Sequence, residues 1–125
     1  FTRYVGWQSQ EGLPDHLYAA DALVVPTVAQ EALGRTAVEA MAAGKPVVAS
    51  RLGGLPFTVA DGATGLLFEP GDAEDLARKL EALLNDPALR ERLGLAGRKR
   101  FEEHYAWPVI IEKHYRPLLC RRRKR

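Results

Sequence analysis

Two glutamates, Glu31 and Glu39, lie eight residues apart, the first in an expected loop and the second inside an expected helix. Gly34, Arg35 and Thr36 open that helix, and a helix N-terminus with free backbone N–H groups is well suited to binding phosphate. Ionised carboxylates only accept hydrogen bonds, and sugar hydroxyls are suitable donors, whereas a phosphate would be repelled. The arrangement therefore suits a diphosphate flanked by two polyhydroxyl groups, as in a nucleotide sugar with its ribose and its transferable hexose.

The same two glutamates also have a structural interpretation. A glutamate in the middle of a helix commonly faces solvent, and one that precedes a helix often caps it. Residue type and spacing alone leave both interpretations open.

Elements that would position these residues follow one another in a regular order. Apolar runs predict strands at 3–7, 22–26, 46–50 and 66–68. Between and after them, amphipathic segments predict helices at 14–21, 34–44 and 72–86, with Asp72 as an N-cap and Gly44 closing the second helix. From Pro87 the chain is expected to be helical almost to its end, with a break at 105–108. Strands that alternate with helices indicate an α/β fold with a parallel, Rossmann-like sheet, whose ligands bind in the loops at the carboxyl ends of the strands.

Charge is distributed unevenly along the 125 residues. The chain has 18 basic and 16 acidic residues, but its last five residues are all basic, so the remainder carries 13 basic and 16 acidic residues. A mildly acidic body argues against nucleic acid as the main partner. The basic tail is interpreted as a solvated end, with weak contact to anionic lipid headgroups as the alternative. It comprises Arg121, Arg122, Arg123, Lys124 and Arg125.

Cysteine content and hydropathy indicate a cytoplasmic protein. The single cysteine, Cys120, excludes an internal disulfide and fits a reducing compartment. Neither a signal-peptide pattern nor an apolar run long enough to span a membrane is present in the sequence. Because the sequence opens at Phe1 directly into strand-like residues, it is expected to be a fragment of a longer protein.

Other kinds of site find little support in the sequence. No Asp-x-Asp pair is present, and the histidines at 16, 104 and 114 lack cysteine or aspartate at metal-ligand spacing, so no metal site is expected. No serine or cysteine has a histidine at a spacing that predicts a nucleophile. The glycine-rich segment at 61–65 leads into a strand and is interpreted as a turn.

The segment YAADALVVPTVAQEALGRTAVEAMAAGKPVVASRLGG, residues 18–54, resembles a known family. It is similar to the C-terminal domain of retaining, nucleotide-sugar-dependent glycosyltransferases with two Rossmann domains, the GT-B fold. The resemblance is to the large glycosyltransferase family 4, which includes sucrose synthase and bacterial mannosyl- and glucosyltransferases. It extends from about Val5 to near Tyr115, and its most specific part is the Glu-x7-Glu signature formed by Glu31 and Glu39.

The resemblance implies a role for each candidate site residue. Glu31 would contact the donor sugar as the catalytic residue, and Glu39 would bind the ribose hydroxyls. Metal and cofactor are not required, since the nucleotide sugar is itself the substrate. Donor-binding backbone is expected at Leu33, Gly34, Arg35 and Thr36, with Trp7 and Gln8 near the base.

The sequence also departs from the family pattern. Family members commonly read Gly-Gly-x-Pro-Glu where this chain has Phe57 after Pro56, which puts the local role of that glutamate in doubt. Family members also carry, before the point that matches Phe1, two strands with a diphosphate-binding Arg and Lys and an N-terminal acceptor domain. Residues 1–119 are therefore interpreted as a truncated donor-binding domain and 120–125 as a tail, inactive as an isolated chain. A non-catalytic, truncated Rossmann-like module used for binding or assembly is the alternative.

Strand order follows from the same resemblance. In the usual order 3-2-1-4-5-6, segment 3–7 would be the third strand of the domain and segment 22–26 the fourth, with the missing strands between them. We expect 3–7 to pair directly with 22–26 in this chain, which gives an all-parallel sheet of about four strands in the order 3–7, 22–26, 46–50, 66–68.

Overall fold

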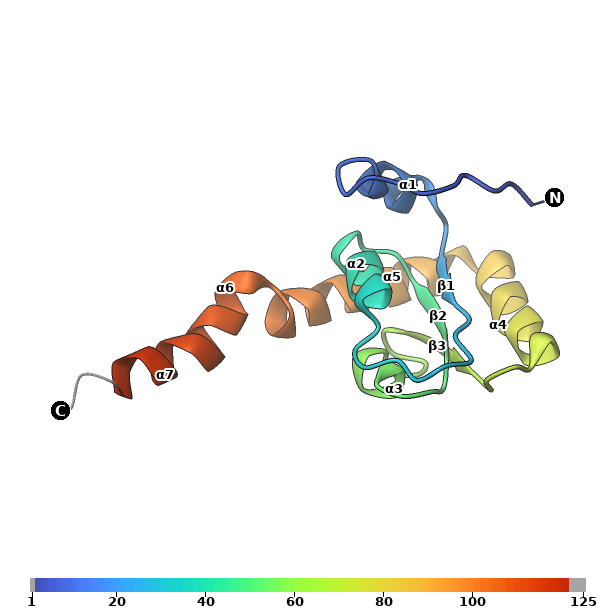
Figure 1. Cartoon of the computed structure of the whole chain (residues 1–125). Coiled ribbons are helices and arrows are strands. Elements are labelled where there is room, and N and C mark those ends of the chain that lie inside the picture. Colours follow the sequence, from blue (N-terminus) through green and yellow to red (C-terminus); the bar gives the residue numbers. More distant parts are fainter. Residues whose placement is uncertain (1, 122–125) are drawn as a thin grey trace.

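A computed structural model describes residues 2–121 of the chain (Figure 1). Strands and helices alternate through the first half, and the second half is helical, as expected for the α/β class. The elements are α1 (Leu13–Ala19), β1 (Leu23–Val25), α2 (Arg35–Ala42), β2 (Val47–Ser50), α3 (Leu55–Thr58), β3 (Gly65–Phe68), α4 (Ala73–Asn85), α5 (Pro87–His104), α6 (Trp107–Ile110), the π-helix η1 (Ile111–Tyr115) and α7 (Arg116–Arg121).

The sheet within the described residues has three parallel strands in the order β1-β2-β3. Leu23 is paired with Val47, and Val47 with Gly65, so the three strands begin at the same level. All four residues of β2 are buried, which explains why its sequence is a continuous apolar run and not an alternating one. The expected order of the last three strands is confirmed, and their carboxyl ends lie at one edge of the sheet.

The expected strand at 3–7 is wrong, and with it the pairing of this segment with 22–26. Residues 2–9 have no regular secondary structure, and the sheet has three strands instead of about four. Gly6 has a φ of 71°, a left-handed conformation that interrupts an extended chain. Tyr4 and Trp7 are 93% and 87% exposed, so the apolar side chains that suggested a buried strand have no core to enter.

Helices cover both faces of the sheet and form two cores. Val47 and Ala49 of β2 pack with Met41 of α2 on one face, where Leu55 of α3 also belongs to the same cluster. Val48, between them in the sequence, points to the opposite face. There it packs with residues of β3, α4 and α5: Phe68, Leu83 and Leu93. Alternation along one buried strand therefore fixes α2 and α4 on opposite sides of the sheet (Figure 1).

Helix ends agree with their sequence signals. The Asp72 carboxylate accepts a hydrogen bond from the Asp75 N–H at 2.9 Å, as expected for an N-cap. Asp86 caps α5 in the same way through the Leu89 N–H. Gly44 has a φ of 69° just after α2, as a helix-terminating glycine requires. Tyr105 and Ala106 separate α5 from α6, which confirms the expected break.

From α6 onward the helical chain leads away from the sheet (Figure 1). None of the helices described in residues 2–121 combines the length and the apolar character that crossing a bilayer requires.

Candidate functional site

The N-terminus of α2 lies directly after the loop that carries Glu31. Gly34 precedes the helix with a φ of 74°, and a Cβ at this position would overlap the Leu55 side chain. The Gly34 N–H donates to Glu31 Oε1 at 3.2 Å, so the carboxylate caps the helix. The expectation that this N–H is free for a ligand is therefore wrong, because the nearby carboxylate occupies it. Among residues 2–121, the N–H groups of Arg35 and Thr36 have no protein acceptor.

Two glycines allow a second loop to pack against the backbone around Glu31. The Gly54 N–H donates to the Glu31 carbonyl at 2.7 Å. A Cβ on Gly54 would overlap the Ala32 carbonyl oxygen, and one on Gly53 would lie 2.9 Å from the Glu31 nitrogen. Glycine is required at both positions because the two backbones are in direct contact. Gly53 and Gly54, which follow β2, therefore determine the position of the loop that carries Glu31.

Two buried hydroxyls hold the same region, and neither contact was expected from the sequence. Thr58 Oγ1 donates to the Leu33 carbonyl at 2.5 Å, and Ser50 Oγ lies 2.7 Å from the Thr27 carbonyl. Both side chains are fully buried. Each hydroxyl therefore joins a loop at the carboxyl edge of the sheet to a neighbouring element.

Glu39 lies along α2 with an ionic partner one turn earlier. Its Oε1 is 3.4 Å from the Arg35 Nε, and the two side chains are 33% and 82% exposed respectively. The spacing of four residues made this pair foreseeable from the sequence. Both residues line a cleft of about 480 Å³ between α1, α2 and α5, together with Tyr18 and Arg98. A carboxylate and a guanidinium on one wall of such a cleft can bind hydroxyl and phosphate groups respectively.

Trp7 and Gln8 lie apart from this constellation. The Trp7 side chain is almost fully exposed. The Gln8 side chain makes local contacts, donating to the Val5 carbonyl at 2.8 Å and placing its oxygen 3.0 Å from His16 Nε2. Neither residue lines the cleft, although the nearby Gln10 does. The candidate residues between Glu31 and Glu39 therefore lie in α2 and in the loop before it, whereas Trp7 and Gln8 form no hydrogen bond with them within residues 2–121.

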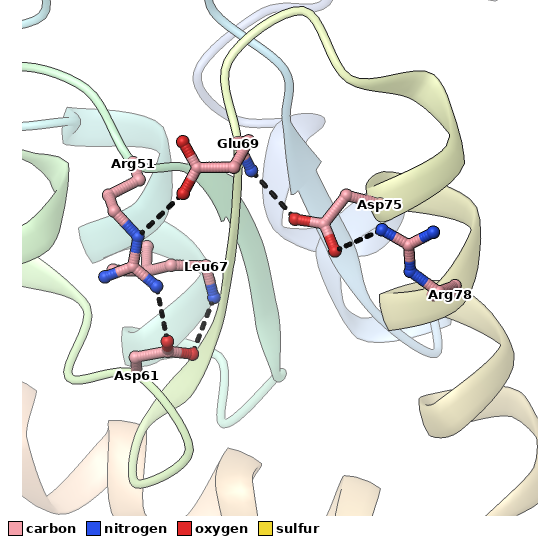
Figure 2. A network of polar contacts seen from close by, with 6 residues as sticks. All are labelled: Arg51, Asp61, Leu67, Glu69, Asp75 and Arg78. Carbon is pink, nitrogen blue, oxygen red and sulfur yellow. Dashed lines mark hydrogen bonds and ion pairs between the residues drawn. The ribbon is translucent and has the colours of Figure 1, made fainter.

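A polar network joins the loops beside β2 and β3 (Figure 2). Asp61 accepts from Arg51 Nη2 at 2.7 Å and from the Leu67 N–H at 2.9 Å, and Arg51 Nε is 3.4 Å from Glu69. Partial burial alone would raise the pKa of Asp61, but these hydrogen bonds outweigh it and the pKa lies below its ordinary value. The interpretation of 61–65 as a turn is confirmed, with Gly62 at a φ of 74°.

The second half of this network involves the start of α4. Asp75 accepts from the Glu69 N–H at 2.9 Å and from Arg78 at 3.3 Å (Figure 2). The backbone hydrogen bond is the main reason why the pKa of Asp75 lies below its ordinary value. Every charged group in the network has a partner of opposite charge or a backbone donor. The network therefore stabilises the positions of these loops and of the start of α4. Within residues 2–121, no group of three or more His, Cys, Asp or Glu side chains is arranged to hold a metal ion.

Comparisons with known proteins agree with this geometry. The family model described as glycosyl transferases group 1 matches residues 2–100. A D-inositol 3-phosphate glycosyltransferase from Streptomyces avermitilis is 46% identical over 98 residues, which cover 78% of this chain and 21% of the relative. The chain therefore spans about a fifth of the length of this curated relative.

Solved structures share the fold. Sucrose-phosphate synthase from Thermosynechococcus elongatus superposes with a TM-score of 0.85 at 41% identity, covering 95% of this chain and 30% of that protein. HepE from Anabaena, in complex with UDP and glucose, gives a TM-score of 0.87 at 26% identity, covering 94% of this chain and 32% of that protein. The parallel sheet with its flanking helices matches the C-terminal domain of GT-B glycosyltransferases.

Proposed function

The chain belongs to the glycosyl transferases group 1 family, and we propose that it is the donor-binding part of an enzyme that transfers a sugar from a nucleotide-diphosphate sugar to an acceptor. The observation that carries this proposal is the start of α2, where two backbone N–H groups without protein acceptors, among residues 2–121, lie between Glu31 and Glu39. Solved relatives in complex with UDP or UDP-glucose support a nucleotide sugar as the ligand.

The diphosphate is proposed to bind at the first turn of α2. The N–H groups of Arg35 and Thr36 can donate to phosphate oxygens, and the helix dipole places partial positive charge at the same point. The Arg35 guanidinium is 82% exposed and can reach an anion beside the helix. Negative charge that develops on the leaving diphosphate would be stabilised there without a metal ion or a cofactor.

Each glutamate has a role that is compatible with its present contact. Glu31 uses Oε1 to cap Gly34, and a carboxylate can accept further hydrogen bonds from a sugar hydroxyl. Glu39 is proposed to accept from the ribose hydroxyls. Its ion pair with Arg35 is largely exposed, and such pairs contribute about 0–1 kcal/mol, so a bound ribose can displace it at little cost.

Further parts of the proposal rest on the family resemblance. The reaction would retain the anomeric configuration, Leu33 and Gly34 would present backbone to the sugar, and Trp7 and Gln8 would lie near the base. The acceptor would bind to an N-terminal domain outside this chain, so the isolated 125 residues are expected to be inactive. A cytoplasmic location is proposed because the chain has a single cysteine.

Nucleotide binding to the 125-residue chain tests the proposal. NMR titrations with uridine, adenosine and guanosine diphosphate sugars should show binding of at least one class. Glu39→Gln should weaken that binding by about 5- to 150-fold, since a hydrogen bond to a charged acceptor contributes about 1–3 kcal/mol. Glu81→Gln, an exposed glutamate on α4, is the matched control and should leave binding unchanged.

Two results would contradict the proposal. Absence of binding for every nucleotide sugar would favour the alternative of a non-catalytic module, and an equal loss in both variants would remove the role of Glu39. In a longer protein that carries this domain, Glu31→Ala should lower turnover more than donor affinity.

A further inference from the structure

Arg100, on α5, binds the end of α3 through two hydrogen bonds. Its Nε donates to the Thr58 carbonyl at 3.0 Å, and its Nη2 donates to the Phe57 carbonyl at 2.6 Å. The last carbonyls of a helix have no partner within the helix, and α3 ends at Thr58. Because Nε and Nη2 lie on one edge of the planar guanidinium, a single side chain fixes the direction of both carbonyls. Arg100 therefore anchors the end of α3 to α5.

Thr58 connects this anchor to the start of α2. Its hydroxyl donates to the Leu33 carbonyl at 2.5 Å, whereas the Gly54 carbonyl at the start of α3 is 3.4 Å away. Leu33 immediately precedes Gly34, the N-cap of α2. The same short helix also packs on Gly34, where an added Cβ would overlap the Leu55 side chain. The start of α2 therefore rests on α3 at two adjacent residues.

One peptide unit links the same anchor to Glu31. The Leu33 carbonyl and the Gly34 N–H belong to a single planar trans peptide, so they point in opposite directions. Thr58 binds the carbonyl, and Glu31 Oε1 accepts from the N–H at 3.2 Å. Because a rotation of this plane would move both contacts together, the orientation of the Glu31 carboxylate is coupled to the position of Thr58.

We propose that Arg100 is a positioning residue for the donor site and acts on Glu31 through Thr58. The inference rests on the proposed function of the start of α2 as that site. A displaced α3 would turn the peptide before Gly34 and, with it, the next two N–H groups of α2. Hydrogen bonds weaken steeply when the donor points away from the acceptor, so this turn would weaken donor binding although every group that touches the donor is still present.

Arg90 supplies a matched control on the same helix. Its Nη1 donates to the Leu83 and Leu84 carbonyls at 2.7 and 2.9 Å, so it binds the last turn of α4 as Arg100 binds the end of α3. Both arginines are half-buried, and α5 packs against α4 as well as α2 (Figure 1). Because α4 lies on the face of the sheet opposite α2, loss of Arg90 removes a similar anchor and leaves the donor site untouched.

NMR of the 125-residue chain with Arg100→Met or Arg90→Met tests the inference. Methionine keeps an unbranched apolar stem and removes the donors. Arg100→Met should shift the amide resonances of Gly34 and Thr36 before any ligand is added. It should also weaken, about fivefold, the binding of whichever of uridine, adenosine and guanosine diphosphate glucose binds the wild type, since that factor is the contribution of one hydrogen bond. Arg90→Met should lower stability to a similar extent and leave both readouts unchanged.

High salt separates a displaced backbone from a lost charge. The weaker binding of Arg100→Met should persist there, because salt screens the effect of a missing charge but not that of a turned peptide. Arg100→Lys keeps the charge without the two-donor edge. It should show the same resonance shifts, which keeps the test decisive if Arg100→Met does not fold.

Thr58→Val tests the second link, because it keeps the shape of the side chain and removes the hydroxyl. It should reproduce both effects, and the double variant with Arg100→Met should bind no more weakly than the weaker single variant, since the two contacts act in series. Additive losses, unchanged resonances of Gly34 and Thr36 in the Arg100 variants, or an equal loss of binding in Arg90→Met would each overturn the inference. If no nucleotide sugar binds the wild type, the proposed function fails, and the ligand-free resonances still decide whether Arg100 positions the start of α2.

Discussion

Replacement of Gly54 by alanine should destabilise the domain and displace the loop that carries Glu31. Gly54 has a φ of −82° and a ψ of −10°, which alanine adopts without strain, so any cost comes from contact alone. The added Cβ would overlap the Ala32 carbonyl oxygen and lie 2.6 Å from its carbon, where ordinary carbon–carbon contact needs about 3.5 Å. To remove this overlap, the loop that contains Ala32 would have to move by about 1 Å. Hydrogen bonds from the Thr58 hydroxyl and the Gly54 N–H hold this loop in place. Overpacking costs about 1–3 kcal/mol, and we expect the upper end because the opposing atoms are backbone.

Urea unfolding followed by far-UV circular dichroism measures this cost. Gly62→Ala is the control, because Gly62 has a φ of 74° but open space around it, so alanine there should cost only about 1–2 kcal/mol of backbone strain. Gly54→Ala should be the less stable of the two and should also bind nucleotide sugar more weakly. A Gly54→Ala protein as stable as the wild type would refute the argument that the two loops are in direct backbone contact.

Three further substitutions test other parts of the structure. Thr58→Val should lower the free energy of unfolding by about 1–3 kcal/mol in urea titrations, because the Leu33 carbonyl loses the hydroxyl that donates to it, whereas Thr58→Ser should be milder. The folded-state pKa of Asp61 is lowered, so its stabilisation is present above the ordinary aspartate pKa of about 4 and is lost as pH falls below it. Asp61→Asn should therefore be less stable at neutral pH and show a flatter decline of stability below about pH 4, and an unchanged acid decline would contradict this. Leu83→Ala should cost about 2–5 kcal/mol by thermal unfolding, since this side chain is 1% exposed in the core under α4, and a cost below about 1 kcal/mol would argue against that core.

The three strands were predictable because their sequences are short apolar runs bounded by turn-forming residues. This held for 22–26, 46–50 and 66–68, whose structures contain β1, β2 and β3. The segment 3–7 has similar composition, yet a strand also needs a partner edge, and composition carries no information on the partner. Gly6, which adopts a left-handed conformation in the structure, was the one local sign against the prediction.

For the candidate site, the sequence identified the residues but predicted few of the contacts that they make. Glu31 and Glu39 were identified from spacing, and the capping interpretation of Glu31 was available from its place before a helix. Its bond to Gly34 confirms the capping contact, while its catalytic role stays a prediction. The hydroxyls of Ser50 and Thr58 bond to carbonyls more than twenty residues away, and such pairings depend on how the loops pack.

Backbone amide NMR of the 125-residue chain during titration with the nucleotide-diphosphate sugar that it binds tests the central claim most directly. If the donor binds at the start of α2, the amide resonances of Arg35 and Thr36 should shift most, and those of α4 should stay in place. In Glu39→Gln the same resonances should move only at higher ligand concentration. Shifts that are absent at the start of α2, or confined to other elements while the ligand binds, would contradict the account.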